Sequence, residues 1–86
     1  MLTVTVYSTG PTCSRCTLTK SDMTKKGVPF EEIDITQNPA AHEYVTGELG
    51  YTEAPVCVVN DDTGQDHWSG FRPDNIARIA AINDAA

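Results

Sequence analysis

The chain has 86 residues, a net charge of −6 and 40% hydrophobic residues, values that suit one small globular domain spanning residues 1–86. The excess of acidic residues argues against a nucleic-acid-binding protein, whose affinity depends on neutralising phosphates. No apolar run approaches the roughly 20 residues of a membrane span, and the N-terminus lacks the pattern of a signal peptide. We therefore expect a cytoplasmic protein that binds neither nucleic acid nor membranes.

The first half of the chain predicts a strand, a helix and a second strand. Residues 2–7 alternate Thr with Val, which is typical of a strand. A helix is expected over residues 13–26, because neither Gly nor Pro interrupts this stretch and Gly27 is a natural C-terminal stop. Residues 30–35 predict the second strand.

The second half predicts a helix, a buried strand, a returning strand and a last helix. These elements are expected over residues 38–50, 56–59 and 65–69, and from Pro73 onward. Asn38 and Pro39 suit the N-cap and the first position of a helix, and the run 60–64 has the composition of a hairpin turn. The order β-α-β-α-β-β-α predicts one α/β domain, with a four-stranded mixed sheet flanked by three helices.

The motif Cys13-Ser14-Arg15-Cys16 lies where the first strand leads into the first helix. A helix N-terminus has unpaired N–H groups and a partial positive charge, which together would stabilise a thiolate at Cys13 and lower its pKa. Arg15 adds a cation, and Cys16, one turn further on, is expected to be more buried and less acidic. The pair therefore predicts a dithiol carrier, in which Cys13 attacks a partner disulfide and Cys16 resolves the mixed disulfide.

A metal-binding or iron–sulfur module is the alternative of another class. A closed zinc site requires four ligands, and beyond the Cys pair the chain offers only Cys57, His42 and His67 as soft ligands. None of these forms a second C-x-x-C motif. Cys57 stands between valines and is expected to be a buried, inert thiol. We therefore expect no bound metal, with a cluster bridging two chains as the open alternative.

Four segments of the chain together resemble the thioredoxin-fold family and, within it, the glutaredoxin-like NrdH-redoxins. The segments are Val4-Thr5-Val6-Tyr7, Cys13-Ser14-Arg15-Cys16 with Thr19-Lys20, Ala54-Pro55-Val56 and Trp68-Ser69-Gly70-Phe71-Arg72-Pro73. The last of them, WSGFRP, is the most specific. The resemblance implies a monomeric electron carrier without a bound cofactor, whose redox group is the Cys13–Cys16 disulfide. The implied partners are class Ib ribonucleotide reductase and thioredoxin reductase, which takes its electrons from NADPH.

The resemblance also implies roles for individual residues. Cys13 is the nucleophile, Cys16 is the resolving thiol and Pro55 follows a cis peptide bond. Thr12 and Arg15 lie on the rim of the site and tune the acidity of the thiol. The implied partner-binding surface comprises Ala54, Pro55, Val56, Trp68, Ser69, Gly70 and Phe71. For Trp68, burial in the core and exposure to a partner are both open.

The chain departs from the family pattern beside the Cys pair. The loop before Cys13 is one residue longer than usual and contains no Lys or Arg, and Ser14-Arg15 replaces the more usual Val-Gln. Both departures change the rim of the site and leave the two thiols in place. We therefore expect the Cys chemistry to be kept, with altered redox potential and partner preference.

Glutathione-dependent glutaredoxins are the alternative within the same fold. They typically carry a basic residue before the Cys pair, a Thr before the cis Pro, and Gly-Gly followed by an Asp. This chain has Ala54 before Pro55 and Ser69-Gly70 in place of the two glycines, although Asp74 could replace the acid in part. A glutathione carboxylate would find fewer charged donors here, so glutathione is not expected as a partner.

Overall fold

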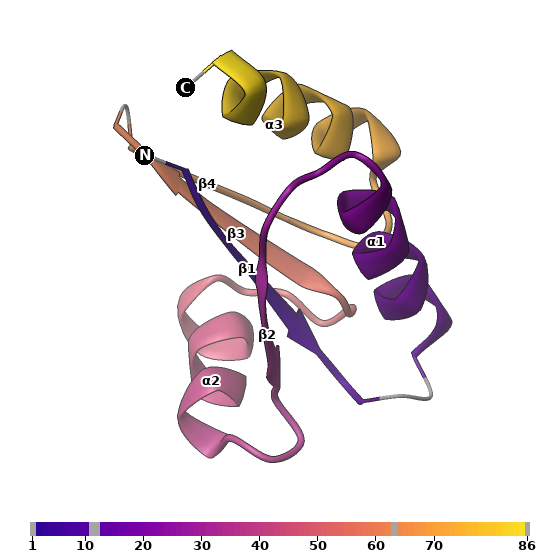
Figure 1. The fold of residues 1–86 in the computed structure, drawn as a ribbon. Coiled ribbons are helices and arrows are strands. Elements are labelled where there is room, and N and C mark those ends of the chain that lie inside the picture. The colour runs from indigo at the N-terminus through magenta and orange to yellow at the C-terminus, as the bar shows by residue number, and fades with distance from the viewer. Residues whose placement is uncertain (1, 11–12, 63, 86) are drawn as a thin grey trace.

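The computed structural model describes residues 2–10, 13–62 and 64–85. Its elements in chain order are β1 (Thr3–Ser8), α1 (Ser14–Lys25), β2 (Glu31–Asp34), α2 (Pro39–Glu43), the π-helical segment η1 (Tyr44–Glu48), β3 (Val56–Asp61), β4 (Gly64–Ser69) and α3 (Pro73–Ala85). Figure 1 shows α1 and α3 on one side of the sheet and α2 on the other. The predicted order of elements is confirmed.

The sheet is four-stranded and mixed, with the strand order β2-β1-β3-β4. β1 runs parallel to β2 and antiparallel to β3, and β4 returns antiparallel along β3. The parallel pair requires a crossover, which α1 provides. Because β1 lies inside the sheet, the loop that follows it toward Cys13 starts between the ends of two neighbouring strands and not at an edge of the sheet.

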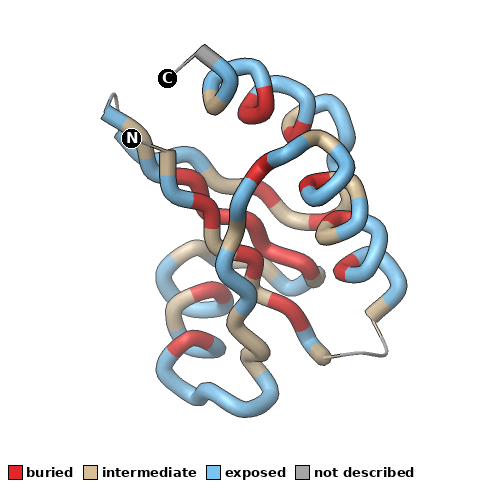
Figure 2. The backbone as a smooth tube through the Cα atoms, in the orientation of Figure 1, coloured by how far each residue is buried: buried red, intermediate tan, exposed pale blue. Residues whose placement is uncertain are grey.

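Side-chain alternation along the inner strands creates a core on each face of the sheet. The core under α1 and α3 contains Val4, Val6, Met23, Val28, Cys57, Val59, Trp68, Ile76, Ile79 and Ala80. The core under α2 and η1 contains Val45, Val56 and Val58, with Tyr7, Ile35, Tyr44, Leu49 and Tyr51 packed against it. Figure 2 shows the buried residues concentrated along the inner strands and on the helix faces turned toward them.

Helix α1 begins and ends as predicted. Cys13 is its N-cap, in an extended conformation, and Gly27 follows its C-terminal end with a φ of 73°, a conformation that favours glycine. Leu18 lies on the outer face, 51% exposed. The face turned toward the sheet carries the buried residues Cys16, Thr19 and Met23.

The second helix differs from the prediction of one regular helix to Gly50. Asn38 caps it as expected, accepting a hydrogen bond from the Ala41 N–H at 3.1 Å. From Tyr44 onward, however, the backbone is π-helical. The Thr46 hydroxyl donates to the His42 carbonyl at 2.8 Å, which is the acceptor that the Thr46 N–H would use in an α-helix. This competition, together with the low helix propensity of the following Gly47, accounts for the wider turn.

The hairpin turn is shorter than the predicted run 60–64. β3 continues to Asp61, which pairs with Gly64 at the start of β4. The Gln65 side-chain amide also donates to the Asn60 side-chain oxygen at 3.3 Å, across the two strands. Residues with turn-forming composition thus extend the ladder, because pairing with the opposite strand satisfies their backbone groups.

Candidate active site

Cys13 occupies the N-cap position of α1, where its sulfur meets the open end of the helix. Its Sγ accepts a hydrogen bond from the Cys16 N–H at 3.2 Å. The Cys13 carbonyl also accepts from the Thr17 N–H at 3.1 Å and the Thr17 hydroxyl at 3.2 Å. A thiolate at Cys13 would therefore be held by an N–H donor and by the positive end of the helix dipole, as the sequence predicts.

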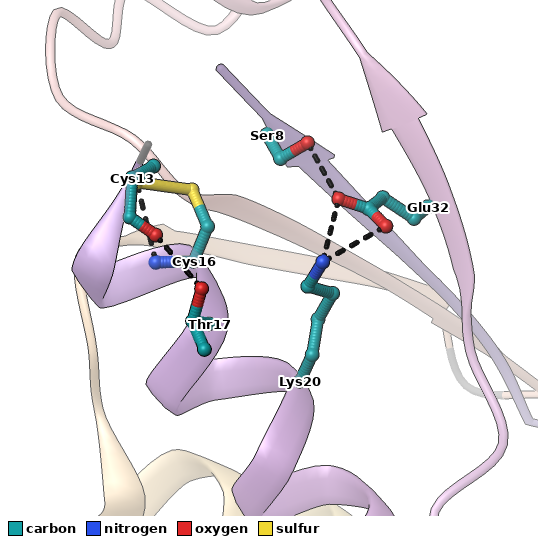
Figure 3. A network of polar contacts seen from close by, with 6 residues as sticks. All are labelled: Ser8, Cys13, Cys16, Thr17, Lys20 and Glu32. Atoms are coloured by element: carbon teal, nitrogen blue, oxygen red, sulfur yellow. Dashed lines mark hydrogen bonds and ion pairs between the residues drawn. A yellow bond between two sulfur atoms is a disulfide. The ribbon is translucent and has the colours of Figure 1, made fainter. Parts of the chain in front are cut away.

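Cys13 and Cys16 are joined in a disulfide, with their Cα atoms 5.2 Å apart (Figure 3). Their exposures differ: Cys16 is 1% exposed, whereas Cys13 is of intermediate exposure. A partner can therefore reach only the Cys13 sulfur, and this asymmetry suits an attacking thiol followed by a buried resolving thiol.

The loop before the disulfide begins with a turn at Gly10. Its φ is 97°, and a Cβ atom there would lie 3.4 Å from an Asp34 carboxylate oxygen. Glycine is thus favoured here by its conformation, since a contact of 3.4 Å is one that a Cβ atom could make. Thr12, predicted to tune the pKa of the thiol, lies outside the described residues.

Arg15 forms an ion pair with Glu53 on the surface, across the mouth of the site. The two side chains are 56% and 57% exposed, so the pair contributes little to stability. It nevertheless gives the cation a carboxylate partner 38 residues away along the chain, which reduces the positive charge that Arg15 would otherwise direct at Cys13. The sequence reasoning missed Glu53, because no local pattern links it to Arg15.

The loop before β3 and the end of β4 meet beside the disulfide. The Ala54–Pro55 peptide bond is cis, as the resemblance implied. The Pro55 carbonyl accepts a hydrogen bond from the Gly70 N–H at 2.8 Å, which ties the two segments together. Next to them lies an open hollow of about 560 Å³, lined by Arg15, Glu53, Ser69, Gly70, Phe71 and Arg72.

Comparisons with known proteins agree with this geometry. The sequence model of the glutaredoxin family matches residues 4–63. The glutaredoxin-like protein NrdH of Escherichia coli is 35% identical over 83 residues, covering 96% of this chain and 95% of the relative. NrdH of Lactococcus lactis is 38% identical over 77 residues, covering 90% and 99%. The chain belongs to the glutaredoxin family, among its NrdH-like members.

The structural comparison gives the same result. The solved NrdH-redoxin of Escherichia coli, described as having a thioredoxin-like activity profile, superposes with a TM-score of 0.77 at 36% identity, covering 88% of this chain and 92% of that one. The fold is thus the predicted thioredoxin/glutaredoxin fold. With its Cys13–Cys16 pair, this NrdH-like chain is a thiol–disulfide oxidoreductase that carries electrons through its cysteines.

The predicted partner-binding surface is only partly exposed in this glutaredoxin. Ala54, Ser69 and Phe71 are of intermediate exposure. The buried members of the predicted set are Pro55, Val56, Trp68 and Gly70. The Trp68 side chain is 5% exposed and belongs to the core under α1 and α3, so the alternative of an exposed Trp is wrong. It is buried because it lies opposite Cys57, on the face of β4 turned toward α3.

A second hollow, of about 240 Å³, lies on the α2 side of the cis-Pro loop. Ala54, Glu53 and Thr9 line its edge, and Tyr7 and Tyr51 contribute aromatic rings. The hydroxyl of Tyr51, one of the residues that line this hollow, lies 2.7 Å from His67 Nδ1, so the His67 ring has a hydrogen-bond partner within the fold. His42, considered above as a possible metal ligand, is exposed.

A polar network that starts one helical turn after Cys16 was not predicted. Glu32 accepts a hydrogen bond from the Ser8 hydroxyl at 2.8 Å, and Lys20 Nζ lies 3.0 Å from each of the two Glu32 carboxylate oxygens (Figure 3). The hydrogen bonds from Ser8 and then from Lys20 lower the pKa of Glu32. The spacing of Lys20, four residues after Cys16, was the signal that could have indicated it.

Cys57, the third thiol, has 0% exposure, in agreement with the predicted core position. Burial raises the pKa of Cys57 from its ordinary value of 9.0 to about 12. Among the described residues, no three His, Cys, Asp or Glu side chains lie together as a metal-binding group. No helix within the same residues is long and apolar enough to cross a membrane.

Because the folded state raises the pKa of Cys57, alkaline pH should destabilise the oxidised protein through this thiol. Between pH 9.0 and about 12 the folded chain keeps the Cys57 proton, whereas the unfolded chain has lost it. The contribution of neutral Cys57 to the free energy of unfolding is therefore complete below pH 9.0 and is lost as the pH rises toward about 12. Urea unfolding at several alkaline pH values should show a steeper decline for the wild type than for Cys57→Ala. Tyr7, whose pKa burial also raises, is common to both proteins. Equal slopes would contradict the prediction.

Proposed function

We propose that this chain is an NrdH-type dithiol carrier, which takes electrons from thioredoxin reductase and delivers them to class Ib ribonucleotide reductase. The observation that carries this proposal is the asymmetry of the Cys pair, with an accessible Cys13 at the helix N-cap and a buried Cys16 behind it. Similarity to NrdH proteins over nearly the whole chain supports the choice of partners. On this proposal the chain acts as a monomer, with residues 1–86 as one domain, in the cytoplasm.

The reaction follows from the two sulfur positions. Reduced Cys13, as the thiolate, attacks one sulfur of the partner disulfide, a mixed disulfide forms and the second partner sulfur leaves as a thiolate. Cys16 then loses its proton to solvent, and its sulfur attacks Cys13 Sγ. The Cys13–partner bond breaks, and the first partner sulfur leaves with the electron pair. The partner gains two electrons and two protons, and the carrier is left as the Cys13–Cys16 disulfide.

The partner segment would lie in the hollow beside the disulfide. Ala54, Ser69 and Phe71 offer partly exposed backbone and side chains there. Arg15 and Glu53 close one side of the hollow as an ion pair. The buried members of the predicted set would support this surface from beneath and would not contact the partner themselves. They are Pro55, Val56, Trp68 and Gly70. We also propose that Thr12 and Arg15 tune the acidity of the Cys13 thiol.

Glutathione is the competing electron donor for a glutaredoxin fold. A glutathione carboxylate would need free cations next to Cys13. Arg15 is already paired with Glu53, whereas among the described residues no carboxylate lies within ion-pair distance of Arg72. Among the described residues that line the hollow, Arg72 alone is a cation free to bind a glutathione carboxylate. We therefore propose that glutathione binds weakly here and is a poor electron donor.

The test is NADPH oxidation with the purified protein and a disulfide substrate. One arm contains thioredoxin reductase, and the other contains glutathione with glutathione reductase. We expect turnover mainly in the first arm, and reconstituted class Ib ribonucleotide reductase should then replace the model disulfide. Turnover mainly in the second arm would mean a glutathione-dependent glutaredoxin. Coloured protein without turnover in either arm would favour the cluster-binding alternative.

A further inference from the structure

A polar network of one ammonium, one carboxylate and one hydroxyl joins α1 to β1 and β2, and its members are Lys20, Glu32 and Ser8. Lys20 Nζ lies 3.0 Å from both Glu32 carboxylate oxygens, and the Ser8 hydroxyl donates to Glu32 at 2.8 Å. Both Glu32 oxygens are thereby occupied. The carboxylate is fixed in position, and it in turn fixes the ammonium.

The fold places Lys20 of this network on the face of α1 that carries Cys16, one helical turn further on. Lys20 is four residues after Cys16 in α1, so the two side chains lie on one face, and helix side chains lean toward the N-terminus. Glu32 is the register partner of Val6, whose side chain is buried under α1 and α3, so Glu32 points to the same face of the sheet. Figure 3 shows the Lys20 side chain directed from α1 toward Glu32 and the Cys16 sulfur bonded to Cys13, one turn nearer the start of the same helix.

The two charges are partly exposed, whereas the thiol that they would influence is buried. Ser8 is 0% exposed and Cys16 is 1% exposed, while the side chains of Lys20 and Glu32 are 30% and 35% exposed. Water and salt screen partly buried charges less than charges on an open surface. A buried thiol ionises with difficulty, and any nearby charge changes that cost.

We propose that the Lys20–Glu32 ion pair controls how readily Cys16 ionises. In this pair the Glu32 carboxylate partly cancels the charge of the Lys20 ammonium, which would otherwise stabilise the Cys16 thiolate. The direction in which each substitution changes Cys16 ionisation does not depend on which of the two charges is nearer to the sulfur. Removing the carboxylate leaves an extra positive charge, which stabilises the Cys16 thiolate. Removing the ammonium leaves an extra negative charge, which destabilises it. Lys20 and Glu32 are thus tuning residues that act through Cys16.

Ionisation of Cys16 matters for the step in which its sulfur attacks Cys13 Sγ and releases the partner thiol, since only the thiolate attacks. This role of Cys16 rests on the proposed function. Asp34, two residues after Glu32 in β2, is a further charged group on this face, and it lines a hollow of about 300 Å³ with Gly10, Lys20 and Glu32. The Arg15–Glu53 pair lies on the surface at the mouth of the site.

The first test measures the ionisation of Cys16 directly, by the ultraviolet absorbance of the thiolate in a Cys13→Ser background. Cys57 stays silent in this titration, because burial raises its pKa to about 12. We expect Glu32→Gln to increase the Cys16 ionisation constant about tenfold and Lys20→Met to decrease it about tenfold. The double variant should return close to the Cys13→Ser parent.

Asp22→Asn is the matched control. Asp22 forms the ion pair with Lys26 near the other end of α1, and it carries the same charge as Glu32. Its substitution therefore changes the net charge equally without changing the surroundings of Cys16. We expect the Asp22→Asn variant to titrate like the parent. Equal shifts for Glu32→Gln and Asp22→Asn, or shifts of the same sign for Glu32→Gln and Lys20→Met, would overturn the proposal.

The second test follows the resolving step in proteins that retain both active-site cysteines. Reduced protein mixed with dithiobis(nitrobenzoate) releases one coloured thiolate when Cys13 attacks and another when Cys16 resolves the adduct. Glu32→Gln should speed the second release about threefold, since the gain in thiolate is partly offset by weaker nucleophilicity. An unchanged second release would contradict the proposal. Neither readout uses a protein partner, so a failed reductase assay would refute the proposed function and leave this result standing.

Discussion

Replacing Cys16 by serine is expected to stop multiple turnover and to leave the partner covalently bound to Cys13. The first attack needs only the accessible Cys13 thiol, whose Sγ sits at the N-cap and accepts the N–H of residue 16, a backbone donor that serine keeps. The second step needs a thiol at position 16. A neighbouring thiol in a folded site acts at an effective concentration of about 10⁵ M or more, which no external thiol can match.

Mass spectrometry of the reaction with a disulfide-containing partner provides the measurement. The Cys16→Ser protein should carry one partner chain, attached at Cys13. Cys13→Ser should carry none, because Cys16 is 1% exposed. Cys57→Ala, which removes a thiol of 0% exposure, should turn over like the wild type. Full turnover by Cys16→Ser would show that a single thiol is enough, and an adduct at Cys57 would contradict the assigned burial.

Elements with local signals were predicted closely. The first helix is specified by residues at its own ends, since Cys13 caps it and Gly27 adopts the positive φ that ends it. Asn38 likewise starts the second helix through a hydrogen bond to Ala41, three residues away. The π-helical segment was missed because it depends on the hydroxyl of Thr46 competing for a carbonyl one turn earlier. A residue pattern records the spacing of apolar side chains and not this competition.

Features of the site that join distant segments were not predicted. The Cys pair is a motif within four residues, so its position at the helix start was clear from the sequence. Glu53, in contrast, is 38 residues from Arg15, and Glu32 is 12 residues from Lys20. Their encounters depend on strand order and register, which place β2 beside β1 and the cis-Pro loop beside the disulfide. One sequence without its fold does not specify those distances.

The position of Trp68 leads to the second large prediction, a loss of stability in Trp68→Ala. The side chain is 5% exposed, lies opposite Cys57 and shares a core with Ile76 and Ile79 of α3. Truncating a buried Trp to Ala typically costs about 3–5 kcal/mol. A small domain has a total stability of about 5–15 kcal/mol, so the variant should be close to unfolding. Urea denaturation followed by circular dichroism measures this, because the chain has 1 Trp and the variant lacks its fluorescence.

Trp68→Phe is the matched control that separates packing from partner contact. Its ring keeps most of the buried apolar surface, and it removes the indole Nε1, which is buried without a hydrogen-bond partner among the described residues. An unsatisfied buried donor costs about 1–3 kcal/mol. Removing it therefore offsets part of the free energy that is lost with the smaller ring, and we expect the free energy of unfolding to fall by less than about 1.5 kcal/mol. Since the indole is covered by α3, Trp68→Phe should also transfer electrons at the wild-type rate. A stable Trp68→Ala protein with slow transfer to its partner would instead place the ring at the partner interface.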